Sequence, residues 1–145
     1  MQRTRDIDSN ARGRRNSLWY NETELNFDNI LIAPSGTHES EIVVVEGFTH
    51  FHLYISRAIN RNCEIFITPY IPFEGAGAPV AATGFPFSLA TWTTGATEGI
   101  FYFGEHNILT SSGAVSMAFA PLISITLENV TVNSENYTVR LYCSD

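Results

Sequence analysis

The chain has 145 residues and a mass of 16.1 kDa, which fits a single domain. It is 44% hydrophobic and 16% charged, and this composition excludes a disordered chain and a coiled coil. The first 15 residues hold five arginines against two aspartates, a local charge of +3, whereas the rest holds three arginines against thirteen acidic residues, −10. We therefore expect an acidic body with a basic extension that binds an acidic surface.

Residues 1–17 form this extension, which we expect to be an extended N-terminal arm. The segment contains one large apolar side chain, Ile7, and has no periodic pattern, so it has no core of its own. An arm of this kind binds a neighbouring molecule, and guanidinium groups pair well with carboxylates. The predicted partner-binding residues are Arg3, Arg5, Arg12, Arg14 and Arg15.

Residues 18–145 alternate apolar and polar side chains with a period of two, as in Phe51, Leu53 and Ile55. This pattern, with turn residues every 8 to 12 positions, predicts antiparallel strands in one β-sandwich domain of jelly-roll-like form. Helix has almost no support. The expected strands lie near residues 25–32, 41–46, 49–56, 63–70, 87–92, 98–103, 114–119, 122–128 and 136–143.

Aromatic residues are more numerous than one buried face requires, and Phe101, Tyr102 and Phe103 must point to both faces of their strand. A strand that is apolar on both faces needs a second cover, from a loop, the arm or another subunit. The long segment 71–97 carries further candidates for interface or ligand contacts. They are Phe73, Phe85, Phe87 and Trp92.

Three interpretations of these aromatic residues stay open. Ordinary core packing accounts for part of them, and a subunit interface is the favoured role for the others. A sugar platform, with Trp92 or Tyr70 stacking on a pyranose ring, is the competing interpretation.

Catalytic motifs are not found in the sequence: it has no nucleophile elbow, zinc-protease helix, phosphate loop or dinucleotide fingerprint. We therefore expect no enzyme activity and no cofactor. His50 and His52 point to the same side of a predicted strand, and we interpret them as exposed histidines of a face or interface rather than metal ligands. Cys63 and Cys143 are expected to be buried thiols, although a single disulfide stays open.

The acidic body argues against direct nucleic-acid binding. No segment approaches the roughly 20 apolar residues of a membrane span, and the N-terminus lacks the apolar stretch of a signal peptide. We therefore expect neither a membrane partner nor secretion by that route.

Six pieces of the chain resemble a β-sandwich module of tailed-phage virion proteins. They are Ala33 to Gly36, Val43 to Phe48, Phe51 to Ser56, Glu64 to Pro69, Pro121 to Leu127 and Tyr137 to Leu141. The resemblance implies a non-enzymatic virion component. It rests on a pattern of strands rather than on a site, so it assigns no functional residue.

These observations together predict a viral structural protein, most simply a capsid decoration or cement subunit. The body is expected to form a homo-oligomer, with a trimer favoured, and to bind the major capsid protein or other virion proteins. The protein would lie on the capsid surface or tail after assembly in the host cytoplasm. The alternatives are a carbohydrate-binding or adhesion module and a minor tail or filament subunit.

Overall fold

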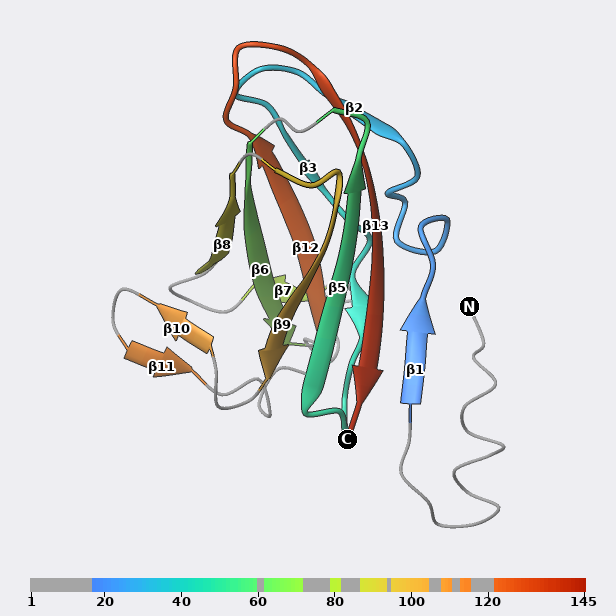
Figure 1. Ribbon diagram of the computed structural model, residues 1–145. Helices are drawn as coiled ribbons and strands as arrows, with labels where there is room; N and C mark the ends of the chain where they lie inside the picture. The colour runs from blue at the N-terminus through green and yellow to red at the C-terminus, as the bar shows by residue number, and fades with distance from the viewer. Residues whose placement is uncertain are drawn as a thin grey trace.

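The computed structural model contains β-strands and, within the residues it describes, no helix (Figure 1). The described residues are 17–59, 62–71, 79–81, 87–93, 95–104, 108–110, 113–115 and 122–145. Over this part of the chain, no helix is long and apolar enough to cross a membrane. The prediction of an all-β protein is confirmed.

Two antiparallel sheets, here called sheet A and sheet B, make up the body. In sheet A, β1 and β2 both pair with β13, β13 pairs with β5, and β5 pairs with β9. In sheet B, β3 and β4 both pair with β12, β12 pairs with β6, and β7 and β8 both pair with β6. The strands of sheet A are β1 (Ser17–Tyr20), β2 (Ile30–Ile32), β5 (His50–Arg57), β9 (Glu98–Gly104) and β13 (Glu135–Ser144). Those of sheet B are β3 (Thr37–Glu39), β4 (Val43–Val44), β6 (Cys63–Ile71), β7 (Val80–Ala81), β8 (Phe87–Trp92) and β12 (Leu122–Asn129).

The chain crosses repeatedly between the two sheets. It passes from β5 in sheet A to β6 and β8 in sheet B and returns to β9 in sheet A, and the last two long strands lie in different sheets, β12 in sheet B and β13 in sheet A. This order is that of a jelly roll. Between β9 and β12 lies a separate two-stranded hairpin, β10 (Ile108–Thr110) and β11 (Gly113–Val115).

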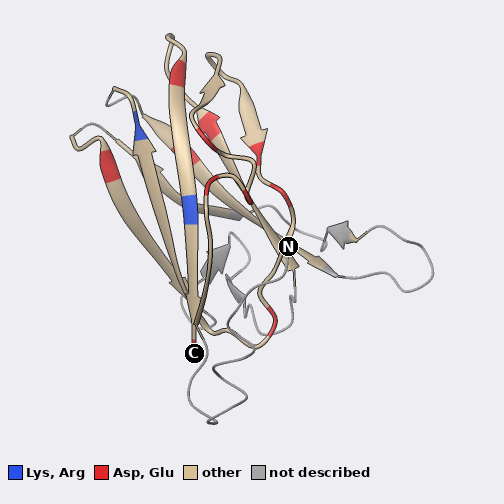
Figure 2. Cartoon of the chain, turned by 90° about the vertical axis from the view of Figure 1, so that its right-hand side faces the viewer, with Lys and Arg blue, Asp and Glu red and all other residues tan. Residues whose placement is uncertain are grey.

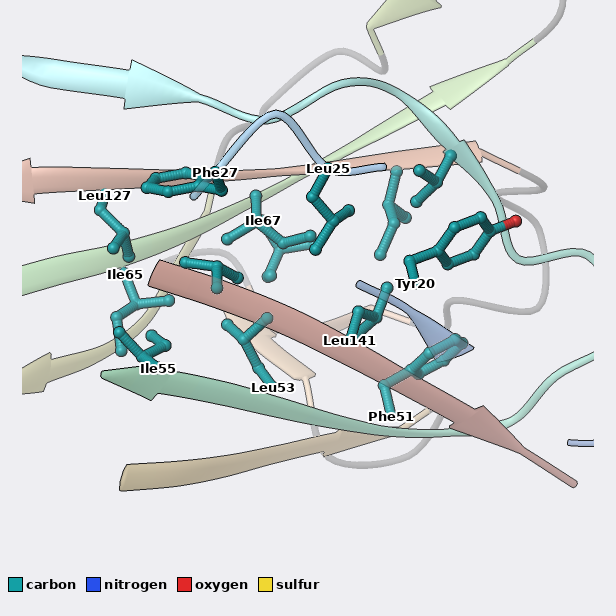
Figure 3. Close-up of a cluster of buried hydrophobic side chains, with 14 of the residues drawn as sticks. Tyr20, Leu25, Phe27, Phe51, Leu53, Ile55, Ile65, Ile67, Leu127 and Leu141 are labelled. Atoms are coloured by element: carbon teal, nitrogen blue, oxygen red, sulfur yellow. The ribbon is translucent and has the colours of Figure 1, made fainter. Parts of the chain in front are cut away.

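The hydrophobic core lies between the inner faces of the two sheets. Figure 3 shows side chains of β5, among them Phe51, Leu53 and Ile55, near those of Ile65 and Ile67 from β6. All five are fully buried, because alternate residues of a strand point to the same face. The alternation seen in the sequence therefore marks the inner faces correctly.

The long central strands agree with the sequence prediction, but the expected strand at 25–32 is wrong in its first part. There the chain forms a turn in which Asn21 and Glu24 bond each other's backbone N–H groups through their side chains. This reciprocal pattern is the capping box of a helix start, and the backbone N–H of Leu25 continues it by bonding the carbonyl of Asn21. Only Ile30–Ile32 remain as a strand.

Two further expected strands differ from the structure. The strand expected at 41–46 is reduced to the two residues of β4. Of the strand expected at 114–119, the structure describes Gly113–Val115 as β11, and residues 116–121 lie outside the described part of the chain.

Candidate binding surfaces

The arginines of the arm, together with Phe73 and Phe85, lie outside the described residues. For Phe87 only the backbone is described, and it pairs with Ile67 in sheet B. Their roles as partner-binding or interface residues therefore stay predictions.

Trp92 lies at one end of the sandwich and is partly buried against the core. Its ring makes an edge contact with Phe101, with 5.4 Å between ring centroids. The guanidinium carbon of Arg57 lies 3.5 Å from the centroid of the Trp92 ring. These contacts give Trp92 a packing role in the structure, and the proposed interface or sugar contact stays a prediction.

Arg57 is itself only 4% exposed. Its guanidinium donates hydrogen bonds to the backbone carbonyl oxygens of Trp92, Thr93 and Ala96. Glu135 is buried in the same region of the sandwich, and its carboxylate accepts hydrogen bonds from the backbone N–H groups of Ile59 and Asn136. Because buried charged groups require such partners, Arg57 holds the loop between β8 and β9. Glu135 instead connects the chain just after β5 to the start of β13.

Cys63 and Cys143 are both buried and free. The Cys63 thiol lies beside the Tyr137 hydroxyl, and burial raises the pKa of the thiol to about 12. Tyr137 and Cys143 are six residues apart on β13, about 20 Å at the rise of an antiparallel strand. Since a disulfide needs Cα atoms within about 7 Å, this geometry supports two separate, unreactive thiols.

The outer face of sheet A carries a row of exposed rings that crosses four strands. The strand register aligns Trp19 on β1 with Tyr142 on β13, His52 on β5 and Tyr102 on β9. The rings of Trp19 and Tyr142 are stacked, with centroids 5.5 Å apart and planes at 12°. We call this row the aromatic face. It confirms that β9 is apolar on both sides, because Phe103 of the same strand is buried in the core.

A shallow groove of about 530 Å³ lies on the aromatic face. We call it the aromatic groove; its lining residues are His52, Tyr54, Ile100, Arg140 and Tyr142. The Arg140 Nε donates a hydrogen bond to Glu22, which lowers the pKa of that carboxyl. The Tyr54 hydroxyl donates to Glu98 Oε1 at 2.8 Å, and this bond raises the pKa of Tyr54.

His50 and His52 are exposed on the same side of β5, as the sequence predicted. Both rings contact Tyr102, with centroid distances of 6.0 and 5.2 Å. Over the described part of the chain, no group of three or more His, Cys, Asp or Glu side chains is placed to hold a metal ion.

Tyr70 lies on the opposite, outer face of sheet B. Its hydroxyl and that of Ser124 both donate hydrogen bonds to the same oxygen of Glu39. The ring is only partly exposed. Tyr70 therefore contributes to a hydrogen-bonded cluster, and its sugar-stacking role stays a prediction.

The segment from Asn21 to Glu46 forms an acidic edge of the sandwich. It contains six acidic residues and no arginine, namely Glu22, Glu24, Asp28, Glu39, Glu41 and Glu46. Figure 2 looks onto this side, where red acidic positions lie on the strands and loops beside β1. We call the groove of about 710 Å³ at this edge the acidic groove; Glu24 and Glu41 line it together with apolar residues that include Ile42, Val44 and Leu122.

The sequence contains more aromatic residues than one buried face requires, but it does not show that Arg140 and Ile100 lie beside the exposed rings. The missing information is the strand register, which sets Arg140 opposite Tyr54 and Tyr54 opposite Ile100. The acidic character of the body was visible in the sequence, whereas the position of residues 21–46 along one edge depends on the pairing of β2 with β13 and of β3 and β4 with β12.

No protein-family model and no curated protein sequence matches the chain. Among solved structures, the VP2 subviral particle of infectious bursal disease virus is similar with a TM-score of 0.52 and 13% identity, over 90% of this chain and 33% of that chain. The SPBc2 prophage-derived protein YomS is similar with a TM-score of 0.43 and 18% identity, over 91% of this chain and 96% of that chain. Tripeptidyl peptidase 2 has a TM-score of 0.47 and 8% identity, over 90% of this chain and 10% of that chain.

The chain thus spans about a third of the VP2 chain and about a tenth of the peptidase. At these identities the similarity shows the fold alone, because one fold hosts many unrelated functions.

Proposed function

We propose that the chain is a structural subunit of a virus particle, a capsid decoration or cement protein that binds the shell as a homo-oligomer. The observation that carries this proposal is the separation of charge along the chain. The basic N-terminal segment precedes β1, and six of the thirteen acidic residues of the body lie in the segment 21–46, which forms the edge beside β1. This separation of charge favours binding of the arm of one copy to the acidic edge of another.

The acidic groove is the part of the body that suits the arm best. Glu24 and Glu41 supply carboxylates for the arm arginines, and Ile42 and Val44 are exposed apolar side chains that can contact Ile7. Sixteen residues precede β1 and span at most about 55 Å when extended. The arm is therefore long enough to reach a neighbouring subunit.

Symmetric repetition makes such contacts effective. Exposed ion pairs are each worth little, but an oligomer that binds a symmetric shell multiplies them through effective concentration. A trimer is the favoured oligomer, and the capsid surface or the tail is the favoured location. The fold shared with the VP2 subviral particle is compatible with this role, as is the resemblance of the strand pattern to tailed-phage virion modules.

The test is sedimentation of the native protein from its source material. We expect it to run with a large particle in fixed stoichiometry to a major shell protein. A variant that lacks residues 2–16 should keep the β-sheet circular dichroism spectrum of the full chain, because β1 begins at Ser17, but should not occupy particles that are depleted of the protein.

Unchanged occupancy of the arm-less variant would refute the role of the arm. A small free oligomer in the native material would refute the decoration role itself and favour an adhesion module. A minor tail or filament subunit would also run with the particle, but at low copy number relative to the shell protein.

A further inference from the structure

The aromatic groove on the outer face of sheet A has a different lining from the acidic groove, and the arm contacts proposed above do not involve it. Its lining combines apolar and aromatic side chains with a charged group. Ile100 and Tyr142 are 68% and 47% exposed, and His52 and Arg140 lie beside them. We propose that the aromatic groove binds a carboxylated pyranose, a sialic or hexuronic acid residue of a glycan. This inference goes beyond the proposed structural function.

Arg140 is the group that would bind the carboxylate. Among the described residues the only other arginine is Arg57, which is buried. Arg140 is held in place by the hydrogen bond from its Nε to Glu22 and by the ring of Tyr54, whose centroid lies 5.4 Å from the guanidinium carbon. Its two terminal nitrogens have no hydrogen-bond partner among the described residues. They are therefore available as the parallel donors that a carboxylate accepts.

Tyr142 would contact the apolar face of the sugar ring. The stacking of its ring on Trp19 fixes its orientation before a ligand binds. A preorganised side chain loses less conformational entropy on binding. Aromatic side chains pack well against apolar C–H surface, and the C–H groups of a pyranose form such a surface.

The hydroxyl groups of a sugar would find polar partners on both sides of this platform. Glu22 lies beside Arg140 at one side, and Tyr54 with Glu98 lies at the other. The core of a protein–protein interface is depleted of Glu and Asp, so the two carboxylates beside the groove, Glu22 and Glu98, favour a sugar over a protein partner. The groove volume of about 530 Å³ lies within the roughly 300–1,000 Å³ of small-molecule sites.

The first experiment is titration of the ¹⁵N-labelled full-length protein with 3′-sialyllactose and with a hyaluronan tetrasaccharide, followed by NMR. We expect saturable shifts for at least one of the two, centred on the amides of β5, β9 and β13. Lactose, which has no carboxylate, is the matched ligand control and should bind at least tenfold more weakly, since hydrogen bonds to charged groups are worth this much.

Variants test the assignment to the groove. Arg140→Gln and Tyr142→Ala should each weaken binding at least tenfold, and Arg140→Lys should weaken it less than Arg140→Gln because it keeps the charge but not the fork of donors. Leu31→Ala is the matched control, since Leu31 is 64% exposed on β2 and lies outside the groove. Circular dichroism checks that each variant is folded.

Four outcomes would overturn the proposal: no shift with either carboxylated sugar at millimolar concentration, equal binding of lactose, no effect of the Arg140 and Tyr142 variants, or tighter binding of a hexaglutamate peptide than of both sugars. The last outcome would assign the groove to an acidic peptide. Sedimentation with the particle is measured independently, so failure of the glycan site and failure of the structural role are distinguishable.

Discussion

Arg57 shows how much a single buried residue contributes to one end of the sandwich. Its guanidinium bonds three backbone carbonyl groups and covers the face of Trp92. Burial lowers the pKa of Arg57, so the charge has a desolvation cost that these bonds must offset. Removing the side chain leaves the carbonyl groups of Trp92, Thr93 and Ala96 without their donor.

We therefore expect Arg57→Met to lower the free energy of unfolding by about 3 kcal/mol, in the range measured when a buried polar partner is removed. Urea denaturation at pH 7 measures it. Arg140→Met is the matched control, because the side chain of Arg140 is 42% exposed in its pair with Glu22 and exposed pairs are worth about 0–1 kcal/mol. Equal losses for the two variants would contradict the structural role of Arg57.

Alternation of apolar and polar residues predicted the long strands because each strand has one face buried in the core. β5, β6, β12 and β13 begin and end within two residues of their predicted bounds. The predicted strand at 25–32 was wrong because local side-chain bonds decide the conformation there, and Leu25 and Phe27 are fully buried although they lie outside any strand. An apolar residue in an alternating pattern therefore indicated burial reliably and strand structure less so.

The turn itself can be tested through its reciprocal bonds. Asn21→Ala should lower the free energy of unfolding by about 1 kcal/mol, as is usual when a capping side chain is lost, and Glu24→Ala should have a similar effect. Thermal or urea unfolding measures both. Glu46→Ala, an exposed acidic residue on the same edge, should change stability by less than about 0.5 kcal/mol. A neutral result for Asn21→Ala would mean that packing of Leu25 and Phe27 alone holds the turn.

The aromatic face could be predicted from the sequence only in part. Alternation placed Tyr54 and Tyr142 on the side of their strands away from the core, but four strands from distant parts of the sequence must come into register before Trp19, Tyr142, His52 and Tyr102 form one row. Register depends on the packing of the whole sandwich. A list of exposed aromatic residues thus becomes a surface only in the folded molecule.

The acidic edge and the aromatic groove have different chemistries, and they meet at Glu22, which accepts a hydrogen bond from Arg140. The acidic edge lies beside β1, where the basic arm joins the body, whereas the aromatic groove is centred on β5, β9 and β13 of sheet A. The acidic edge suits a cationic partner and the aromatic groove a ligand with ring faces and a carboxylate. An oligomer formed through the arms can therefore leave the aromatic groove accessible.

A charge exchange tests the arm and the acidic groove together. Glu24→Arg with Glu41→Arg should shift the full-length protein from oligomer to monomer in sedimentation velocity, and so should replacement of Arg12, Arg14 and Arg15 by glutamate. Combining both sets restores opposite charges, so the oligomer should return at low salt and weaken as ionic strength screens the pairs. Glu64→Arg with Glu128→Arg, two acidic residues opposite each other in sheet B, is the matched control and should leave the oligomer intact. If the combined variant stays monomeric while correctly folded, the arm does not bind at the acidic groove.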